Sequence, residues 1–322
     1  MKLVLAPMEG VVDAQMRQLL TGLGGYDLCV TEFIRVNEQK LPPKVFYRLC
    51  PELLTKGQTA SGTPVRVQLL GQSPHWLALN AITAIQLGSP GIDLNFGCPA
   101  KTVNQSRGGA VLLKEPQLIH EIVAAVRQAV PAQYPVSAKI RLGYDSKEHA
   151  VEIADAVASA GATELTVHAR TKMDGYRPPA YWPWIDKIRQ HVHIPIIANG
   201  EIWDHTSLQQ CQEQTNVDQF MVGRGAVATP NLGNMLKNNA PKLTWPEVLT
   251  LLLQFSTLPD NDKDIIYYPS RTKQWFSYLR LSYPEADPLF RELRTLRQKE
   301  LITQVLQQHL TILKPTVFNH EK

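Results

Sequence analysis

Eight short β-rich segments alternate with helical patterns over the first three quarters of the chain. This alternation constrains the fold more than any other feature. The segments cover residues 3–7, 27–33, 65–70, 91–95, 136–141, 164–168, 195–199 and 218–222. Helical patterns lie between most of them, as at 116–129, 150–160 and 182–191. Such alternation pairs strands in parallel through crossover helices, and eight units close naturally into a (β/α)8 barrel. We therefore predict an α/β protein with a TIM barrel.

An open, doubly wound sheet is the alternative fold for the same alternation. A G-x-G-x-x-G fingerprint after the first strand would favour it, but Pro7, Met8, Glu9 and Gly10 stand there. Length agrees with a barrel, because a typical barrel takes about 250 residues. The 322 residues of the chain leave room for one small additional domain.

The alternation ends near residue 241, and only helical patterns follow. They cover residues 245–258, 270–281, 287–296 and 298–313, with turns predicted at 259–262 and 283–284. We therefore predict two domains, a catalytic barrel over residues 1–242 and an all-helical domain over residues 243–322.

Composition excludes several classes of protein. Charged residues make up 19% and hydrophobic residues 44% of the chain, as in an ordinary soluble globular protein. The net charge of +4 mildly favours a polyanionic partner. The four cysteines have no C-x-x-C spacing, which argues against a zinc site or a disulfide framework. Signal-peptide and membrane-span patterns are absent. We expect a cytoplasmic protein without a metal ion.

Cys98 stands in a Gly-Cys-Pro loop directly after the predicted strand at 91–95. Active sites of α/β folds lie at the carboxyl ends of the strands. Cys29, Cys50 and Cys211 lie in sequence contexts without a comparable motif. We expect them to behave as small buried hydrophobic residues. Cys98 is therefore the candidate for a chemical role.

Polar and special side chains cluster at the carboxyl ends of nearly all the predicted strands, and such a set is hard to explain by packing. They include Met8, Glu9, Gln68, Asn95, Lys139, Arg141, His168, Arg170, Asn199, Glu201 and Arg224. Buried charges cost several kcal/mol unless they are paired, so this cluster indicates a bound ligand. Loops after the seventh and eighth strands form the usual phosphate site of a barrel. Gly200 and Gly223 suit such a site, since glycine lets the backbone approach an anion. These features favour a phosphorylated organic cofactor such as FMN.

The motifs at these strand ends occur in the order found in tRNA-dihydrouridine synthases. They are P-M-E-G at 7–10, N-F-G-C-P at 95–99, K-I-R-L-G at 139–143, H-A-R-T at 168–171, N-G-E-I at 199–202 and G-R-G-A at 223–226. The resemblance extends over essentially the whole chain, which is similar to the bacterial C subfamily acting on position 16 of the tRNA D-loop. It implies an FMN-dependent oxidoreductase that reduces the C5–C6 double bond of this uridine to 5,6-dihydrouridine, with NADPH as transient electron donor.

The resemblance also implies roles for individual residues. The flavin ring would be lined by Pro7, Met8, Glu9 and Gln68, and Lys139 would contact the flavin and its ribityl chain. The ribityl and phosphate end would be held by His168, Asn199, Gly200, Glu201, Gly223 and Arg224. The flipped uridine would face Asn95, Arg141 and Tyr176. Further tRNA contacts are expected from Arg35, Arg271, Lys273, Gln274 and Arg280.

A hydride added to C6 of uracil leaves negative charge that needs a proton at C5. An unperturbed thiol, with a pKa of about 8.5, is mostly protonated at pH 7 and can serve as this acid. We therefore expect Cys98 to be the proton donor and not a nucleophile. Arg141 would stabilise the charge that develops on the uracil oxygens.

The helical region carries the charge expected of an RNA-binding surface. Seven basic and three acidic residues lie between 271 and 299. Arg291, Arg294 and Arg297 recur at every third residue and so fan over one side of a helix. Tyr267, Tyr268, Trp275 and Tyr278 are interleaved with the basic residues.

Two other functions share some of these features. A flavin barrel acting on a free pyrimidine, similar to dihydroorotate dehydrogenase, would keep the cofactor site but leave the basic helices without a purpose. A non-catalytic tRNA-binding protein would not need both Cys98 and Lys139. We expect a monomer that grips one tRNA without an obligate protein partner.

Overall fold

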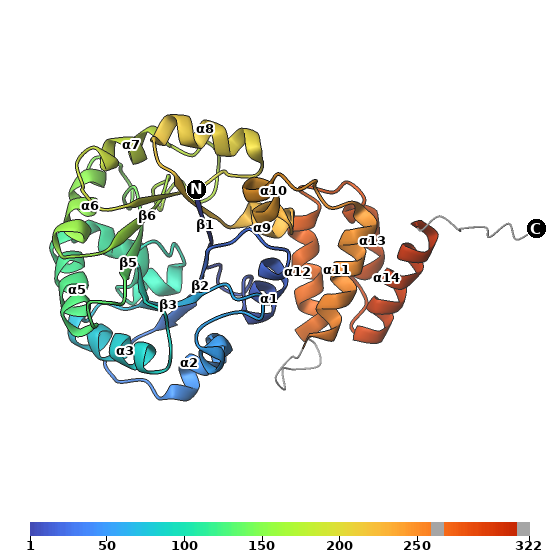
Figure 1. Ribbon diagram of the computed structural model, residues 1–322, viewed down its shortest axis with the longest axis horizontal. Helices are drawn as coiled ribbons and strands as arrows, with labels where there is room; N and C mark the ends of the chain where they lie inside the picture. Colours follow the sequence, from blue (N-terminus) through green and yellow to red (C-terminus); the bar gives the residue numbers. More distant parts are fainter. Residues whose placement is uncertain (259–266, 314–322) are drawn as a thin grey trace, which may run out of the picture.

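The fold is the predicted closed barrel. A computed structural model describes residues 1–258 and 267–313. In this part of the chain eight parallel strands close into one barrel in the order β1 to β8 (Figure 1). The strands are β1 Lys2–Leu5, β2 Leu28–Arg35, β3 Val65–Leu70, β4 Ile92–Asn95, β5 Val136–Arg141, β6 Glu164–His168, β7 Ile196–Asn199 and β8 Gln219–Val222. Each strand ends within two residues of its predicted limit.

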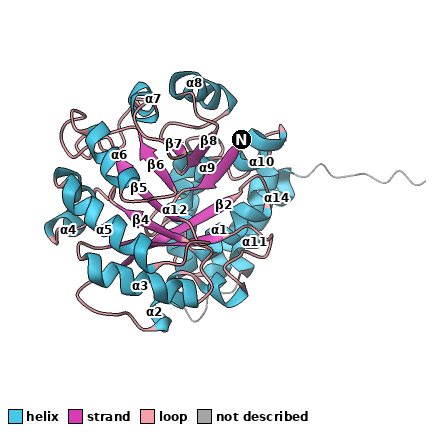
Figure 2. Cartoon of the chain, turned by 60° about the vertical axis from the view of Figure 1, so that its left-hand side comes forward, coloured by secondary structure: helices cyan, strands magenta, loops and turns pink. Residues whose placement is uncertain are grey.

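Helices surround the barrel and connect its strands (Figure 2). They are α1 Ala14–Gly22, α2 Pro43–Leu49, α3 Pro74–Gln86, α4 Lys101–Gln105, α5 Pro116–Ala129, α6 Ala150–Ser159, α7 Pro183–Arg189 and α8 His205–Thr215, with 3-10 helices at Pro51–Thr55 and Gly109–Lys114. Two short helices, α9 Arg224–Ala228 and α10 Leu232–Asn238, follow β8. Helices α3, α5 and α7 have proline in their first turn, where no intrahelical hydrogen bond is lost.

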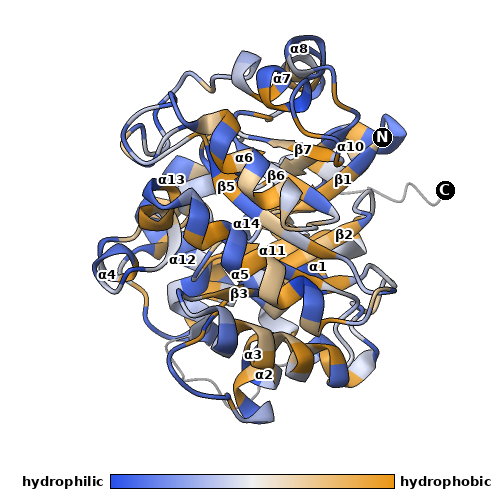
Figure 3. Cartoon of the chain, turned by 90° about the vertical axis from the view of Figure 1, so that its left-hand side faces the viewer, coloured by the Kyte–Doolittle hydropathy of each residue, from blue (hydrophilic) through white to orange (hydrophobic). Residues whose placement is uncertain are grey.

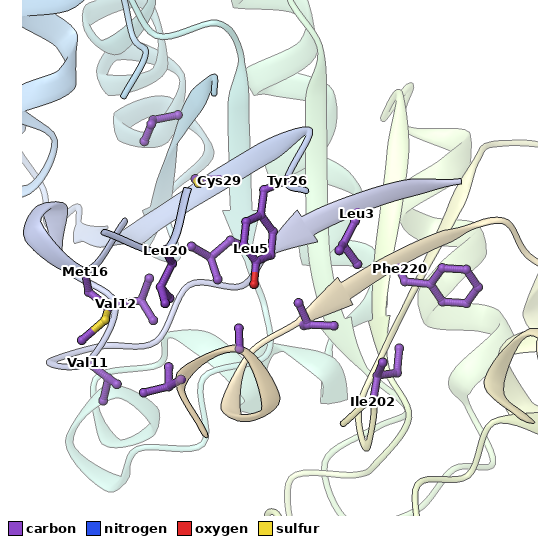
Figure 4. Packing of buried hydrophobic residues seen from close by; sticks show 14 of the residues in the cluster. Leu3, Leu5, Val11, Val12, Met16, Leu20, Tyr26, Cys29, Ile202 and Phe220 are labelled. Atoms are coloured by element: carbon purple, nitrogen blue, oxygen red, sulfur yellow. The ribbon is translucent and has the colours of Figure 1, made fainter. Parts of the chain in front are cut away.

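Alternation along the strands divides their side chains into an outer and an inner set. Figure 4 shows Leu3 and Leu5 of β1 near Met16, Leu20 and Tyr26. All five are buried in one hydrophobic cluster that fills the space between strands and helices. The strands are largely hydrophobic, whereas the helices around them carry hydrophilic segments (Figure 3). This outer layer is the main core of the barrel.

The inside of the barrel has an apolar side and a polar side. The apolar side is a small cluster formed by Val4, Ala6, Leu28, Val30, Ile197 and Met221. Strands β3 to β6 place polar side chains in register at their inward positions. These are Arg66, Gln68, Asp93, Asn95, Ser137, Lys139, Arg141, Glu164, Thr166 and His168. The polar side therefore leads from the floor of the barrel to its carboxyl-terminal mouth.

Four helices follow the barrel and lie against its α1 and α9 side (Figure 1). They are α11 Trp245–Thr257, α12 Tyr267–Leu279, α13 Ala286–Leu293 and α14 Lys299–Leu313. The indole Nε1 of Trp275 in α12 donates to the carbonyl oxygen of Val227 in α9 at 2.9 Å. Because one hydrophobic cluster includes buried residues of both regions, the division at residue 242 stays a prediction. The turn predicted at 259–262 lies outside the described residues.

Every helix of residues 1–258 and 267–313 is too short or too polar to cross a membrane.

Candidate active site

A cavity of about 590 Å³ opens at the carboxyl-terminal end of the strands. All eight strands or the loops after them contribute to its wall, as expected for the site of a barrel enzyme. It is lined by every residue predicted to hold the cofactor, namely Pro7, Met8, Glu9, Gln68, Lys139, His168, Asn199, Gly200, Glu201, Gly223 and Arg224. Cys98, Asn95, Arg141 and Tyr176 line the same cavity. The structure thus brings the predicted cofactor, acid and uridine residues together.

The Cys98 loop is held by hydrogen bonds on both sides. Asn95 Oδ1 accepts from the backbone N–H groups of Gly97 at 2.9 Å and Cys98 at 3.0 Å. Arg141 Nε donates to the Gly97 carbonyl oxygen at 2.9 Å, and Asn104 Nδ2 donates to that of Cys98 at 2.9 Å. Burial raises the pKa of the Cys98 thiol. At neutral pH the thiol is therefore protonated and able to donate a proton.

Lys139 lies deeper in the mouth, between β4 and β6. Its Nζ donates to Asn199 Oδ1 at 2.8 Å, and Asn199 Nδ2 donates to the Met221 carbonyl oxygen at 2.8 Å. Burial and the positive charge of Arg141 lower the pKa of Lys139 to about 7. An anionic ligand in the cavity would favour the charged form of this lysine.

Several basic side chains lie in and behind the part of the cavity wall that the loops after β6, β7 and β8 form. Arg170 Nη2 lies 2.8 Å from Glu201 Oε1, and Arg224 Nη2 lies 2.5 Å from the same oxygen. Burial and the charges of Arg141 and the other nearby cations hold the pKa of His168 well below its usual range, so its imidazole is neutral. Arg170 lies behind the wall, whereas Glu201 and Arg224 line the cavity, so Arg224 is the guanidinium group that could meet an anion such as a phosphate.

Two glycines in this wall lie close against neighbouring side chains. Gly200 has a φ of +121°, and an added Cβ would lie 3.0 Å from His168 Cδ2. At Gly223 an added Cβ would lie 3.2 Å from the sulfur of Met8. A side chain at either position would therefore press on a residue of the cavity wall, and glycine avoids this.

Aromatic rings form the outer wall of the cavity. The Arg224 guanidinium lies 5.2 Å from the ring centroids of both Tyr176 and Trp203. Arg141 lies 5.1 Å from the Tyr176 ring on its inner side. Tyr278 of α12 also lines the cavity, so the helical region contributes directly to the wall.

Sequence reasoning missed several wall residues. Glu32 and Phe33 line the cavity because an irregularity of β2 between Val30 and Phe33 changes the alternation of its side chains. The same shift brings Arg35 towards the Cys98 loop, where its Nη2 donates to the hydroxyl of Ser106 at 3.0 Å. Trp203 was missed as well; its place directly after the Asn-Gly-Glu-Ile motif at 199–202 was the available signal.

The residues of the helical region that are predicted to bind tRNA lie outside the cavity wall. Lys273 and Gln274 are half-buried on α12, and Arg280 is exposed just after that helix. Arg271 is buried, and its guanidinium donates to the carbonyl oxygens of Gly10 and Val11. It joins α12 to the loop after β1, so its predicted tRNA contact stays a prediction. Arg291, Arg294 and Arg297 are exposed.

A closed parallel barrel with a polar mouth defines a barrel enzyme, and comparison with known proteins identifies the family. The family model described as dihydrouridine synthase (Dus) matches residues 4–313. This chain belongs to the dihydrouridine synthase family.

Similar proteins support the same assignment. A Vibrio parahaemolyticus protein named tRNA-dihydrouridine(16) synthase is 57% identical over 310 residues, 96% of each chain. A Shewanella oneidensis protein with that name is 56% identical over 308 residues, 96% of this chain and 98% of the other. Among solved structures, the old yellow enzyme homologue from Zymomonas mobilis shares the fold at 12% identity. Its TM-score is 0.51, and the match covers 76% of this chain and 90% of that one.

The lowered pKa of Lys139 makes stability depend on pH in the ligand-free protein. Between its folded pKa of about 7 and its ordinary value of 10.5, the unfolded chain binds more protons, so stability rises with pH. We expect Lys139→Met to be more stable relative to wild type at pH 7 than at pH 9, the advantage shrinking by about 2 kcal/mol between the two pH values. Urea unfolding at both pH values measures it. An equal difference at the two pH values would contradict the assigned pKa.

Proposed function

We propose that this protein reduces the C5–C6 double bond of uridine 16 in the tRNA D-loop to 5,6-dihydrouridine. The observation that carries the proposal is one cavity whose wall contains both a protonated thiol, Cys98, and several basic side chains. Membership of the dihydrouridine synthase family supports the reaction. The names of near full-length relatives support position 16.

FMN is the cofactor that suits this cavity, and NADPH is the proposed electron donor. A volume of about 590 Å³ lies within the range of cofactor pockets. Gly200 and Gly223 place backbone without a side chain in the cavity wall, and Arg224 supplies positive charge. Lys139 and Gln68 would hold the ring system deeper in the mouth. Bound flavin supplies the hydride that reduces the base.

The protein's own residues handle the proton and the developing charge. Cys98 donates its thiol proton to C5 of the uracil, and the resulting thiolate is reprotonated from solvent. The raised pKa of Cys98 favours the protonated form before each turnover. Arg141, fixed by carbonyl oxygens of Gly97, Thr171 and Gly175, stabilises negative charge on the uracil oxygens. Asn95 would contact the base from the same wall.

The uridine must leave its stack to reach this cavity, at a cost of a few kcal/mol. Tyr176, half of whose surface is exposed, offers a ring on which an extruded base can stack. The exposed arginines of α13 and the segment after it, with Arg280, would bind the tRNA backbone. We assign catalysis to residues 1–242 and tRNA binding to 243–322, in a cytoplasmic monomer without an obligate protein partner.

Dihydrouridine mapping tests the reaction. Unmodified tRNA incubated with the protein, FMN and NADPH is digested and analysed by mass spectrometry. We expect dihydrouridine at position 16 alone. Dihydrouridine at another position would contradict the proposed selection of the site. Conversion of free uracil without conversion of tRNA would favour a small-pyrimidine oxidoreductase, and loss of all turnover in protein that binds tRNA would favour a non-catalytic role.

Cys98→Ala tests the proton donor. We expect tRNA reduction to fall by roughly 10²–10⁴-fold, because positioned acids contribute about that factor. Reduction of bound flavin by NADPH should continue, since that step needs no proton at C5. Cys211→Ala, at a buried cysteine of α8, is the matched control. Turnover of Cys98→Ala at a rate near wild type would rule out the assigned acid.

Arg280→Ala tests whether the helical region binds tRNA. Arg280 is exposed, and its guanidinium lies 3.8 Å from Asp287. Losing one phosphate contact should weaken tRNA binding. It should also reduce by about 1 the slope of the logarithm of the binding constant against the logarithm of the salt concentration. Filter binding at several salt concentrations measures both quantities, with Arg48→Ala on α2 as an exposed control. Unchanged affinity and slope would remove Arg280 from the tRNA surface.

A further inference from the structure

A chain of buried hydrogen bonds connects the middle of the barrel to the Cys98 loop. Strand register places Gln68 of β3, Asp93 of β4 and Ser137 of β5 side by side. Gln68 Nε2 donates to Asp93 Oδ2 at 2.7 Å, and Ser137 Oγ donates to Asp93 Oδ1 at 2.5 Å. Asn95 Nδ2 donates to Gln68 Oε1 at 2.8 Å. Gln68, Asp93 and Ser137 are at most 2% exposed, and Asn95 is 9% exposed.

The direction of these bonds matters because an amide has one donating and one accepting end. Asp93 Oδ2 accepts from Gln68, so Gln68 turns its oxygen towards Asn95. Asn95 must then donate to Gln68 and turn its own oxygen to the loop. There it accepts from the N–H groups of Gly97 and Cys98. With either amide reversed, two donors would face each other in a buried place.

Asp93 is the member of the chain that sets this direction. Burial raises the pKa of its carboxyl group. A proton on Oδ1 would only reverse the bond with Ser137, and Oδ2 would still accept from Gln68. Arg66 holds Ser137 from the other side, with Nη1 donating to its hydroxyl at 2.9 Å, and is itself paired with Glu164. The acceptor facing Gln68 is therefore fixed from the floor of the barrel.

We propose that Asp93 is a positioning residue for Cys98. By accepting from Gln68 it orients the two amides that hold the backbone of Gly97 and Cys98. Asp93 is buried and does not line the cavity, so we expect it to act through its neighbours and not by contact with cofactor or substrate. Its consequence for catalysis rests on the proposed function of Cys98, whereas its effect on the loop does not.

The rate at which iodoacetamide alkylates Cys98 reports how firmly the loop holds this residue. It can be measured without tRNA or NADPH. Cys29, Cys50 and Cys211 are fully buried, and the mass of the labelled peptide identifies the reacting thiol. Asp93→Leu removes the acceptor, and Asp93→Asn is the matched control because its amide oxygen can still face Gln68. We expect Cys98 of Asp93→Leu to react about tenfold faster than wild type, the factor expected for losing one buried hydrogen bond. In Asp93→Asn the rate of Cys98 alkylation should stay within about twofold of the wild-type rate. Equal rates in folded Asp93→Leu and Asp93→Asn would overturn the proposal.

A second pair of variants applies if Asp93→Leu does not fold. Gln68→Glu, with a proton shared between its carboxyl group and Asp93, can still accept from Asn95, whereas the thioether of Gln68→Met is only a weak acceptor. We expect faster alkylation of Cys98 in Gln68→Met than in Gln68→Glu, and equal rates would overturn the proposal. In turnover, Asp93→Leu should lower kcat for tRNA while its KM stays within about twofold. If Cys98→Ala proved active, the proton donor would be wrong, but the alkylation results would still decide the role of Asp93.

Discussion

Buried polar groups on one side of the barrel must satisfy one another, and the active site depends on this requirement. The main-chain groups of β3 to β6 are used by the sheet itself. Inward side chains such as Asp93, Ser137 and Glu164 therefore bond laterally to side chains of neighbouring strands. Unpaired, each buried polar group would cost roughly 1–3 kcal/mol. The pairing that keeps the interior stable also orients the residues at the mouth.

Much of the barrel and of its mouth could be predicted from the sequence because both follow from local patterns. Buried parallel strands read as short apolar runs, and the structure confirms their limits to within two residues. The inward residues near the end of such a run, and those just after it, must lie at the mouth once the barrel closes. Cys98, Lys139, His168 and Asn199 could therefore be assigned to one site before any distances were known.

Other parts depend on contacts between distant segments, which local patterns do not show. The irregularity in β2 changes the alternation after Val30, and so Glu32 and Phe33 were not predicted to line the cavity. Tyr278 reaches the cavity only because α12 lies against α9. Arg271 belongs to a basic stretch, yet it is buried against the loop after β1. Counting charged residues in a sequence cannot distinguish a buried arginine that joins two segments from an exposed one.

The bond from Trp275 to Val227 limits how the chain could be recombined with its relatives. Val227 belongs to α9, the helix that begins at Arg224 in the anion-binding wall, and Tyr278 stands one turn after Trp275. A chimaera joined at residue 242 would leave α9 from one parent against α12 from the other. Such a graft would mismatch one wall of the cavity and the proposed RNA-binding surface together. The workable unit of exchange therefore includes α9 and the loop before it.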